Sequence, residues 1–334
     1  MYEFATGVID VWEKRLLSGL DQERMLKAPN KESAFMVLFD TDLSEIIAGG
    51  SKINIEDVFL QDLTTLKNKL TSVLNDNGLL IGFLFLKFDA SNIKGILKRH
   101  YFKEETKNFK PFNFSIEAYK KEEEFLAKTL FNNQKEASFT EKISNVFVDK
   151  LLKEIVKKIE VNLVEGSIMS SEFIERIVDV AYFEVKYFLA KKEKALLEMV
   201  KLEIDMANLR SLLSKGNQNF LEEGNLSKDQ IEGLASGKEK DLSNNLKKFL
   251  ESLEIGFLLE GIQGLNLDIT TERKIDSYIA KKTFQKEKEK GSGIEKVLAF
   301  FQKKMNSYTN IRLILFAKEN NLQVEEIEKV LLPI

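Results

Sequence analysis

The sequence predicts an all-α protein built from three similar helical domains, and two observations support this. Proline lacks an amide hydrogen and clashes with the preceding helical turn, and the chain contains it only at Pro29, Pro111 and Pro333. Good helix formers, above all Leu, Glu and Lys, are abundant instead. Hydrophobic residues make up 43% of the chain, which is enough for a sizeable core. The second observation is an internal repeat.

The repeated pattern is an asparagine followed by an aliphatic residue, a basic residue and, further on, a leucine. Its members are Asn92, Lys94 and Leu97 in the first copy, Asn208, Arg210 and Leu213 in the second, and Asn310, Arg312 and Leu315 in the third. The leucine lies one helical turn beyond the aliphatic residue, on the same face. We therefore expect each segment to begin a helix that carries an apolar stripe.

A second repeated block precedes each of these segments and carries Asp62, Asp179 or Asp276. The second block lies about thirty residues before the asparagine in all three copies, and this preserved separation favours an internal repeat over the chance reuse of helical patterns. Each copy would be a helical domain of roughly 100 residues, an ordinary domain size. The approximate boundaries are residues 1–115, 116–222 and 223–334. Three similar domains in one chain suggest a pseudo-threefold arrangement around a hub or pore.

Three further segments have the pattern of particular elements. Residues 79–86, LLIGFLFL, predict a fully buried helix or strand, because a membrane-spanning helix needs roughly 20 such residues. Between residues 143 and 163, apolar residues alternate with charged ones at helical spacing, which predicts a long amphipathic helix. The Lys- and Glu-rich run 281–290 predicts a solvated helix end or loop. Gly291 and Gly293 would then interrupt the helical structure before the next helix begins.

The charge balance and the lack of cysteine exclude several classes of function. Lys and Arg total 50, Asp and Glu total 53, and the net charge is −3. This argues against a general nucleic-acid binder, which needs a basic excess to neutralise phosphates. The absence of cysteine excludes disulfides, thiolate metal sites and thiol catalysis. A secretory signal is not expected, since the first helix-length segment carries several charges and no apolar core.

No catalytic constellation is visible, so we expect no catalytic, cofactor-binding or metal-binding residues. His100 is the single histidine, which excludes a catalytic triad and a histidine-based metal site. Residues 233–238, GLASGK, faintly resemble a phosphate-binding loop. They have one residue too few between the glycines, and Glu239 follows the lysine; we interpret them as a turn. An enzyme whose carboxylates converge from distant parts of the chain stays an alternative.

The repeated asparagines and basic residues each have two interpretations. Asparagine is a preferred N-cap residue, because its side-chain oxygen accepts a hydrogen bond from the first helical turn; the other structural role is an interhelical hydrogen bond. The basic residues are harder to explain by folding. In a pseudo-threefold arrangement they would occupy equivalent places and form a partner-binding ring. The simpler interpretation is three local ion pairs, each contributing about 0–1 kcal/mol if exposed.

Four stretches resemble the family of the C subunit of V/A-type ATPases, whose eukaryotic counterpart is the d subunit. Near the C-terminus, residues 307–331 read SYTNIRLILFAKENNLQVEEIEKVL. In the middle copy, residues 173–185 read FIERIVDVAYFEV and residues 203–213 read EIDMANLRSLL. Near the N-terminus, residues 12–29 read WEKRLLSGLDQERMLKAP. The chain departs from the family at Gly224–Asn225, where a Gly-Gly pair is common.

The resemblance implies a funnel of three similar helical domains with no catalytic role and no bound nucleotide or other cofactor. Such a protein sits on the ring of membrane rotor subunits and receives the shaft of the central stalk, so that torque passes between ATP chemistry and ion transport. It would be peripheral, at the cytoplasmic face of the membrane. The alternative from a different class is a helical repeat scaffold or adaptor unrelated to ATPases.

Overall fold

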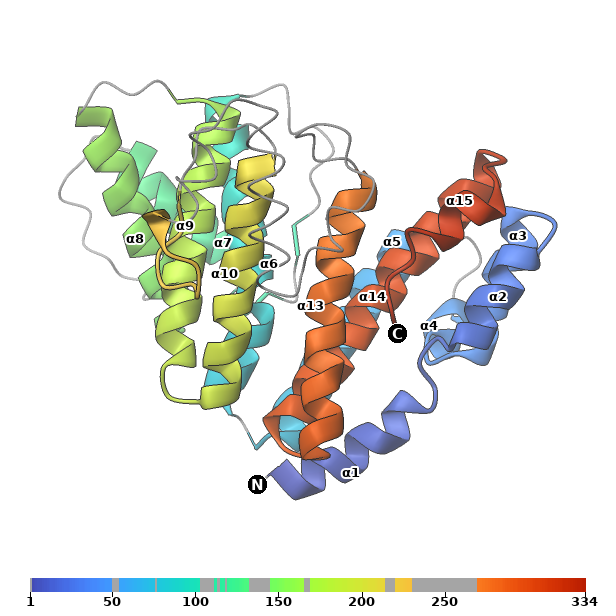
Figure 1. The fold of residues 1–334 in the computed structure, drawn as a ribbon. Helices are drawn as coiled ribbons and strands as arrows, with labels where there is room; N and C mark the ends of the chain where they lie inside the picture. Colours follow the sequence, from blue (N-terminus) through green and yellow to red (C-terminus); the bar gives the residue numbers. More distant parts are fainter. Residues whose placement is uncertain are drawn as a thin grey trace. The chain divides into compact units, whose positions relative to one another are not determined.

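The structure is a computed structural model that describes residues 2–49, 54–75, 77–102, 111–112, 115–117, 119–131, 145–164, 169–213, 220–229 and 269–334. Every regular element within these residues is a helix (Figure 1), so the predicted all-α fold is confirmed. The chain divides into two compact units. One contains Leu60–Leu197, and the other combines Met1–Phe59 with Glu198–Ile334. The boundaries fall within α5 (Ile55–Val73) and α10 (Lys194–Leu213). The division into three domains stays a prediction.

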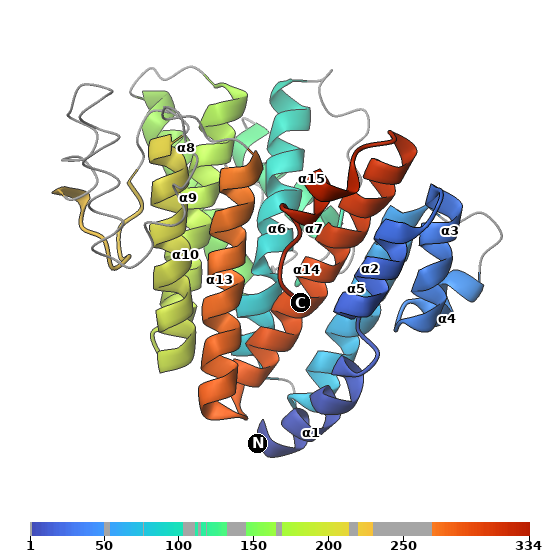
Figure 2. The same cartoon turned by 45° about the vertical axis from the view of Figure 1, so that its right-hand side comes forward.

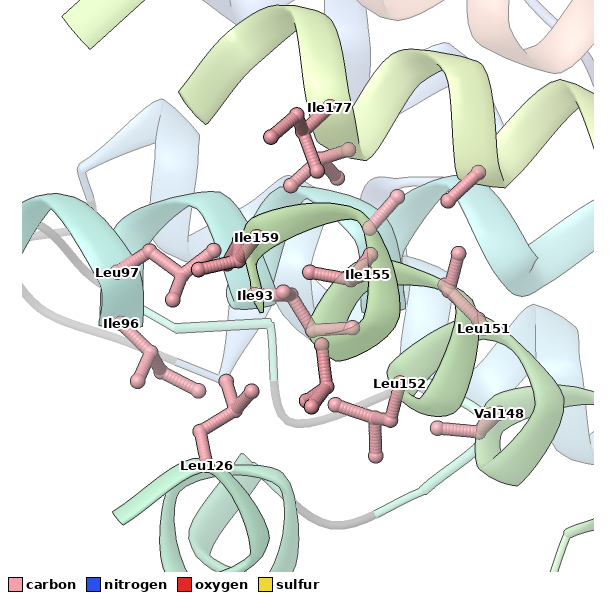
Figure 3. Close-up of a cluster of buried hydrophobic side chains, with 14 of the residues drawn as sticks. Ile93, Ile96, Leu97, Leu126, Val148, Leu151, Leu152, Ile155, Ile159 and Ile177 are labelled. Carbon is pink, nitrogen blue, oxygen red and sulfur yellow. The ribbon is translucent and has the colours of Figure 1, made fainter. Parts of the chain in front are cut away.

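The unit of residues 60–197 is built on α6 (Gly78–Tyr101), which packs most extensively against α9 (Ser171–Ala190). The shorter α7 (Tyr119–Leu126), which continues into the π-helical turn η2 (Ala127–Phe131), and α8 (Val146–Val164) complete its core. Apolar side chains from these helices meet in one cluster (Figure 3). Its labelled members are Ile93, Ile96, Leu97, Leu126, Val148, Leu151, Leu152, Ile155, Ile159 and Ile177.

The second unit is organised around α14 (Ile294–Glu319), which lies between α13 (Ile269–Lys290) and the N-terminal helices (Figure 2). The N-terminal elements are α1 (Tyr2–Glu13), α2 (Gly19–Lys27), α3 (Lys31–Met36), the 3-10 helix η1 (Val37–Asp40) and α4 (Ser44–Ala48). The short α15 (Val324–Glu328) follows α14. The first and last parts of the sequence therefore share one core, in which the Trp12 and Phe300 rings lie 5.9 Å apart.

Local sequence explains where several helices start. Ser18 and Asp21 form a capping box at α2, because each side chain accepts a hydrogen bond from the other residue's backbone amide. Before α14, Gly291 and Gly293 have φ of 71° and 87°, a region that side chains disfavour. The predicted break at these glycines is confirmed. So is the helix predicted near residues 143–163, which is α8.

Two other sequence expectations have different outcomes. The apolar run 79–86 lies in α6, so of the two predicted alternatives the helix is the one found. The expectation that each repeated asparagine begins a helix is wrong. Asn92, Asn208 and Asn310 lie in the second halves of α6, α10 and α14. Tertiary hydrogen bonds at these positions override the cap preference of asparagine.

Candidate functional site

Each repeated asparagine binds both backbone groups of a single residue in the chain that follows its helix. The side-chain amide nitrogen donates to that residue's carbonyl, and the side-chain oxygen accepts from its N–H. We call this pair of bonds the asparagine lock, and its distances lie between 2.8 and 3.1 Å. The locks join Asn92 with Phe112, Asn208 with Leu221 and Asn310 with Leu332.

Burial makes the asparagine lock selective for an amide side chain. The three asparagines are at most 2% exposed, so water cannot replace a lost partner. A buried peptide group needs one acceptor and one donor, and the asparagine amide supplies both from one side chain. An aspartate would lack the donor, and an apolar residue would lack both. The lock therefore folds the connection after each helix back onto that same helix.

A second lock, made by an aspartate three residues earlier, is present in the first two copies. Asp89 accepts from the amides of Ile116 and Glu117, at 3.0 and 2.9 Å. Asp205 accepts from the amides of Asn225 and Leu226, at 2.8 and 2.9 Å. Burial raises the pKa of Asp205, and these amide donors offset part of that rise. The aspartate locks were not predicted, although the shared Asp-x-x-Asn spacing was a usable signal.

The third copy replaces the aspartate with Ser307, whose hydroxyl donates to the Lys303 carbonyl within α14, at 2.8 Å. The adjacent Asn306 instead donates its side-chain amide to the carbonyl of Pro333, at 2.6 Å. The third copy therefore has no counterpart of the aspartate lock among these residues, and Asn306 holds the last connection through a carbonyl and not through its amides.

The aspartate lock of the second copy also accounts for the sequence at Gly224–Asn225. A Cβ on Gly224 would lie 2.3 Å from Oδ1 of Asp205, which is closer than any real contact. The position therefore requires glycine. The side-chain amide of Asn225 donates to the other carboxylate oxygen, at 2.7 Å. Asparagine thus adds a third hydrogen bond to Asp205 that a second glycine would not supply.

The repeated basic residues all make ion pairs within the chain. Lys94 pairs with Glu175 and with Asp179, the latter at 2.8 Å. Arg210 pairs with Asp276. The guanidinium of Arg312 binds both oxygens of Glu56, each at 2.6 Å. Of the two interpretations of these residues, local ion pairs are present for all three. A role in partner binding stays a prediction.

The ion pairs follow a common rule. Each basic residue, on α6, α10 or α14, pairs with an acid on the helix that carries the aspartate block of the next copy. Lys94 of the first copy reaches α9, Arg210 of the second reaches α13, and Arg312 of the third reaches α5. Asp179 and Asp276, the block aspartates of the second and third copies, are thus the partners of Lys94 and Arg210. In the first copy the partner of the basic residue is Glu56 and not the block aspartate Asp62. The order of pairing is cyclic.

These charged pairs are partly exposed, so each contributes modestly to stability. The side chain of Lys94 is 21% exposed and that of Arg312 is 46% exposed. Burial lowers the pKa of Lys94, but its two carboxylate partners outweigh burial and hold the pKa above its ordinary value. Burial raises the pKa of Asp179, and Lys94 offsets this only in part because Lys94 is shared with Glu175.

The described residues offer little that resembles a reaction centre. Within them, no group of three or more His, Asp or Glu side chains is arranged to hold a metal ion. No helix in this part of the chain is long and apolar enough to span a membrane. His100 is exposed, and its ring lies edge-on to Tyr101 at 5.0 Å. Residues 233–238, predicted to form a turn, lie outside the described residues. The arrangement fixes helices to one another and to their connections.

Comparison with known proteins identifies the family. The sequence profile described as ATP synthase (C/AC39) subunit matches residues 5–330. The chain therefore belongs to this family, whose members are subunits of V/A-type ATPases, and the resemblance seen in the sequence is confirmed. A comparison with curated proteins found no match.

Replacing Asn310 with Ala is expected to destabilise the chain by about 1–3 kcal/mol, because both backbone groups of Leu332 lose their buried partner. Asn320→Ala is the matched control. Asn320 lies at the exposed end of the same helix and donates one bond to the Phe316 carbonyl, so its loss should cost at most about 1 kcal/mol. Urea unfolding of the two variants measures the difference. Equal midpoints would show that the lock contributes nothing beyond a surface bond.

Proposed function

We propose that this chain is a non-catalytic central-stalk subunit of a V/A-type rotary ATPase, which links the rotor shaft to the membrane rotor ring and transmits torque. The observation that carries the proposal is the family match over residues 5–330, which leaves almost no part of the chain for an unrelated activity. Its partners are the shaft subunits and the rotor ring subunits. It would lie peripherally at the cytoplasmic face of the membrane and bind no nucleotide, other cofactor or nucleic acid.

The locks support a role as a stiff spacer. A torque-bearing part has to resist relative movement of its helices and of the connections between them. In each copy the connection is held to its helix by hydrogen bonds that are shielded from water, which are costly to break. Secondary structure alone leaves connections mobile. The asparagine locks therefore stiffen the segments that would otherwise yield first under load.

The cyclic order of the ion pairs supports the proposed pseudo-threefold, funnel-like arrangement of three similar domains. Every copy donates a basic residue to the next copy and receives one from the copy before it, with the third copy acting on the first. A linear array would leave its terminal copies without one of these contacts. This arrangement gives a spacer in which load on one domain passes to both of the others.

The junction between the third copy and the first carries additional charged contacts. Lys296 of α14 binds Asp10, Glu13 and Glu287, at 2.8, 2.6 and 2.8 Å, and its side chain is only 9% exposed. Burial lowers the pKa of Lys296, but the three carboxylates outweigh burial and keep the pKa above its ordinary value. Lys304, with a 3% exposed side chain, pairs with Asp42. Through Asp10, Glu13 and Asp42, these contacts join α14 to the N-terminal segment of the chain.

The direct test of the proposal is recovery of the chain from its native membranes. A tagged chain is expected to co-purify with shaft and rotor ring subunits of a rotary ATPase, while the isolated chain neither hydrolyses ATP nor binds nucleotide by calorimetry. A scaffold of another kind would recover neither set of subunits. Nucleotide turnover by the pure chain would contradict the non-catalytic role.

A charge swap separates partner binding from internal pairing at the three basic positions. Arg312→Glu combined with Glu56→Arg restores the internal pair but inverts the charge that a partner meets. The analogous swaps exchange Lys94 with Asp179 and Arg210 with Asp276. If the basic residues also form a partner surface, the combined swap loses shaft binding while the helix content measured by circular dichroism is unchanged. Undiminished shaft binding would leave these residues a structural role only.

A further inference from the structure

The unit of residues 60–197 contains two neighbouring buried carboxyl groups, Asp89 and Glu122, and neither the locks nor the ion pairs account for the second of them. Glu122 on α7 is 0% exposed, and neither of its carboxyl oxygens has a hydrogen-bond partner among the described residues. It neighbours the carboxyl group of Asp89 on α6, which is also 0% exposed. Buried polar groups are normally satisfied, so an exception of this kind calls for an explanation.

The charged groups around the pair do not neutralise it. From α5, the ammonium of Lys67 donates to the carbonyl of Ser115, and its charge lowers the pKa of Asp89 without outweighing burial. From the connection between α6 and α7, the carboxylate of Glu117 accepts from the Asn145 amide and pairs with Lys121. Neither Asp89 nor Glu122 forms an ion pair with any described residue. Two adjacent carboxylates in such a site cannot both be ionised without strong repulsion.

We propose that Asp89 and Glu122 share one proton and act as a pH-sensitive latch, which holds α7 against α6 while the proton is bound and releases α7 when both groups ionise. A carboxylic acid beside a carboxylate donates a hydrogen bond to it and halves the charge that has to be buried. Loss of that proton replaces the bond with repulsion between two anions. The inference stands on the contacts in this unit and is independent of the proposed function.

The direction of the pKa shifts agrees with a retained proton. Burial raises the pKa of Asp89 to about 6, although the amides of Glu117 and Ile116 act in the opposite direction. Burial and the neighbouring Asp89 charge raise the pKa of Glu122 well above its ordinary value of 4.5, although the side-chain amide of Asn92 acts in the opposite direction. A carboxyl whose pKa is raised by folding binds its proton more tightly in the folded chain. The latch is therefore strongest below the ordinary pKa of a carboxyl group. It weakens as the pH rises from there toward the raised pKa of the buried pair.

The neighbouring bonds limit what the latch releases. Asp89 also holds the amides of Ile116 and Glu117, which lead directly into α7, so this connection loosens with the helix. The Asn92 lock on Phe112 is made by a neutral amide and does not titrate. Release should therefore stop before Phe112 and expose the apolar face of α7, where Phe125 and Leu126 are buried.

Hydrogen exchange of the full chain across a pH series tests the latch, once the rates are corrected for the intrinsic pH dependence of exchange. Above the pKa of about 6 for Asp89, where the pair keeps a single proton, release of that proton should increase the opening of α7 about tenfold per pH unit. Glu122→Gln keeps the shape of the side chain but cannot ionise, so it should remove this slope. Glu124→Gln changes an exposed residue of the same helix and should keep the slope of the wild type. A slope that survives in Glu122→Gln, or is absent from the wild type, overturns the proposal.

A second measurement uses only the wild-type chain, so its outcome does not depend on whether a variant folds. Exposed Asp and Glu are ionised at neutral pH, so the infrared spectrum of the wild-type chain should show a carboxylic-acid carbonyl band there only if a buried carboxyl keeps its proton. The band should disappear on further alkaline titration, together with the protection of α7. A neutral-pH spectrum without such a band contradicts the shared proton.

Discussion

The asparagine lock is the constraint on which the rest of the structure depends. A long helix fixes its own backbone, but it does not determine where the chain goes after its last turn. In all three copies, one buried amide binds both backbone groups of a residue in the following connection. This holds that residue against the helix that carries the asparagine. It also requires an apolar surrounding that excludes water, because the bonds are strong only where water does not compete.

Charged contacts then relate one copy to the next, and they differ in kind from the locks. The pairs at Lys94, Arg210 and Arg312 are partly exposed and specify register more than they add stability. Lys296 and Lys304 are different because they are nearly buried. Losing their carboxylate partners would leave an uncompensated buried cation, which is strongly destabilising. The junction of α14 with the N-terminal helices therefore depends on complete pairing of its buried lysines. The ion pairs of Lys94 and Arg210, which join the other copies, tolerate exposure to water.

Much of the fold and part of the site could be predicted from the sequence. Scarce proline, the periodicity of α8 and the glycines before α14 act locally, and each was interpreted correctly. The spacing of Asn92, Asn208 and Asn310 predicts a repeat, but it also suggested helix starts, because cap preference is local while the lock partner lies beyond the end of the helix. Glu122 gave no signal: it lies in a charged run that looks solvent-exposed, and only the packing of α7 on α6 buries it.

Native-state hydrogen exchange at the amides of Phe112, Leu221 and Leu332 tests the central claim most directly. All three lie outside helices, and connection amides usually exchange quickly because local fluctuations open them. If the asparagine locks hold the connections as described, these three amides should exchange only when the surrounding helices open. Their protection factors should then equal those of neighbouring helical amides. Exchange at the rate of an exposed loop at any of the three would contradict the account for that copy.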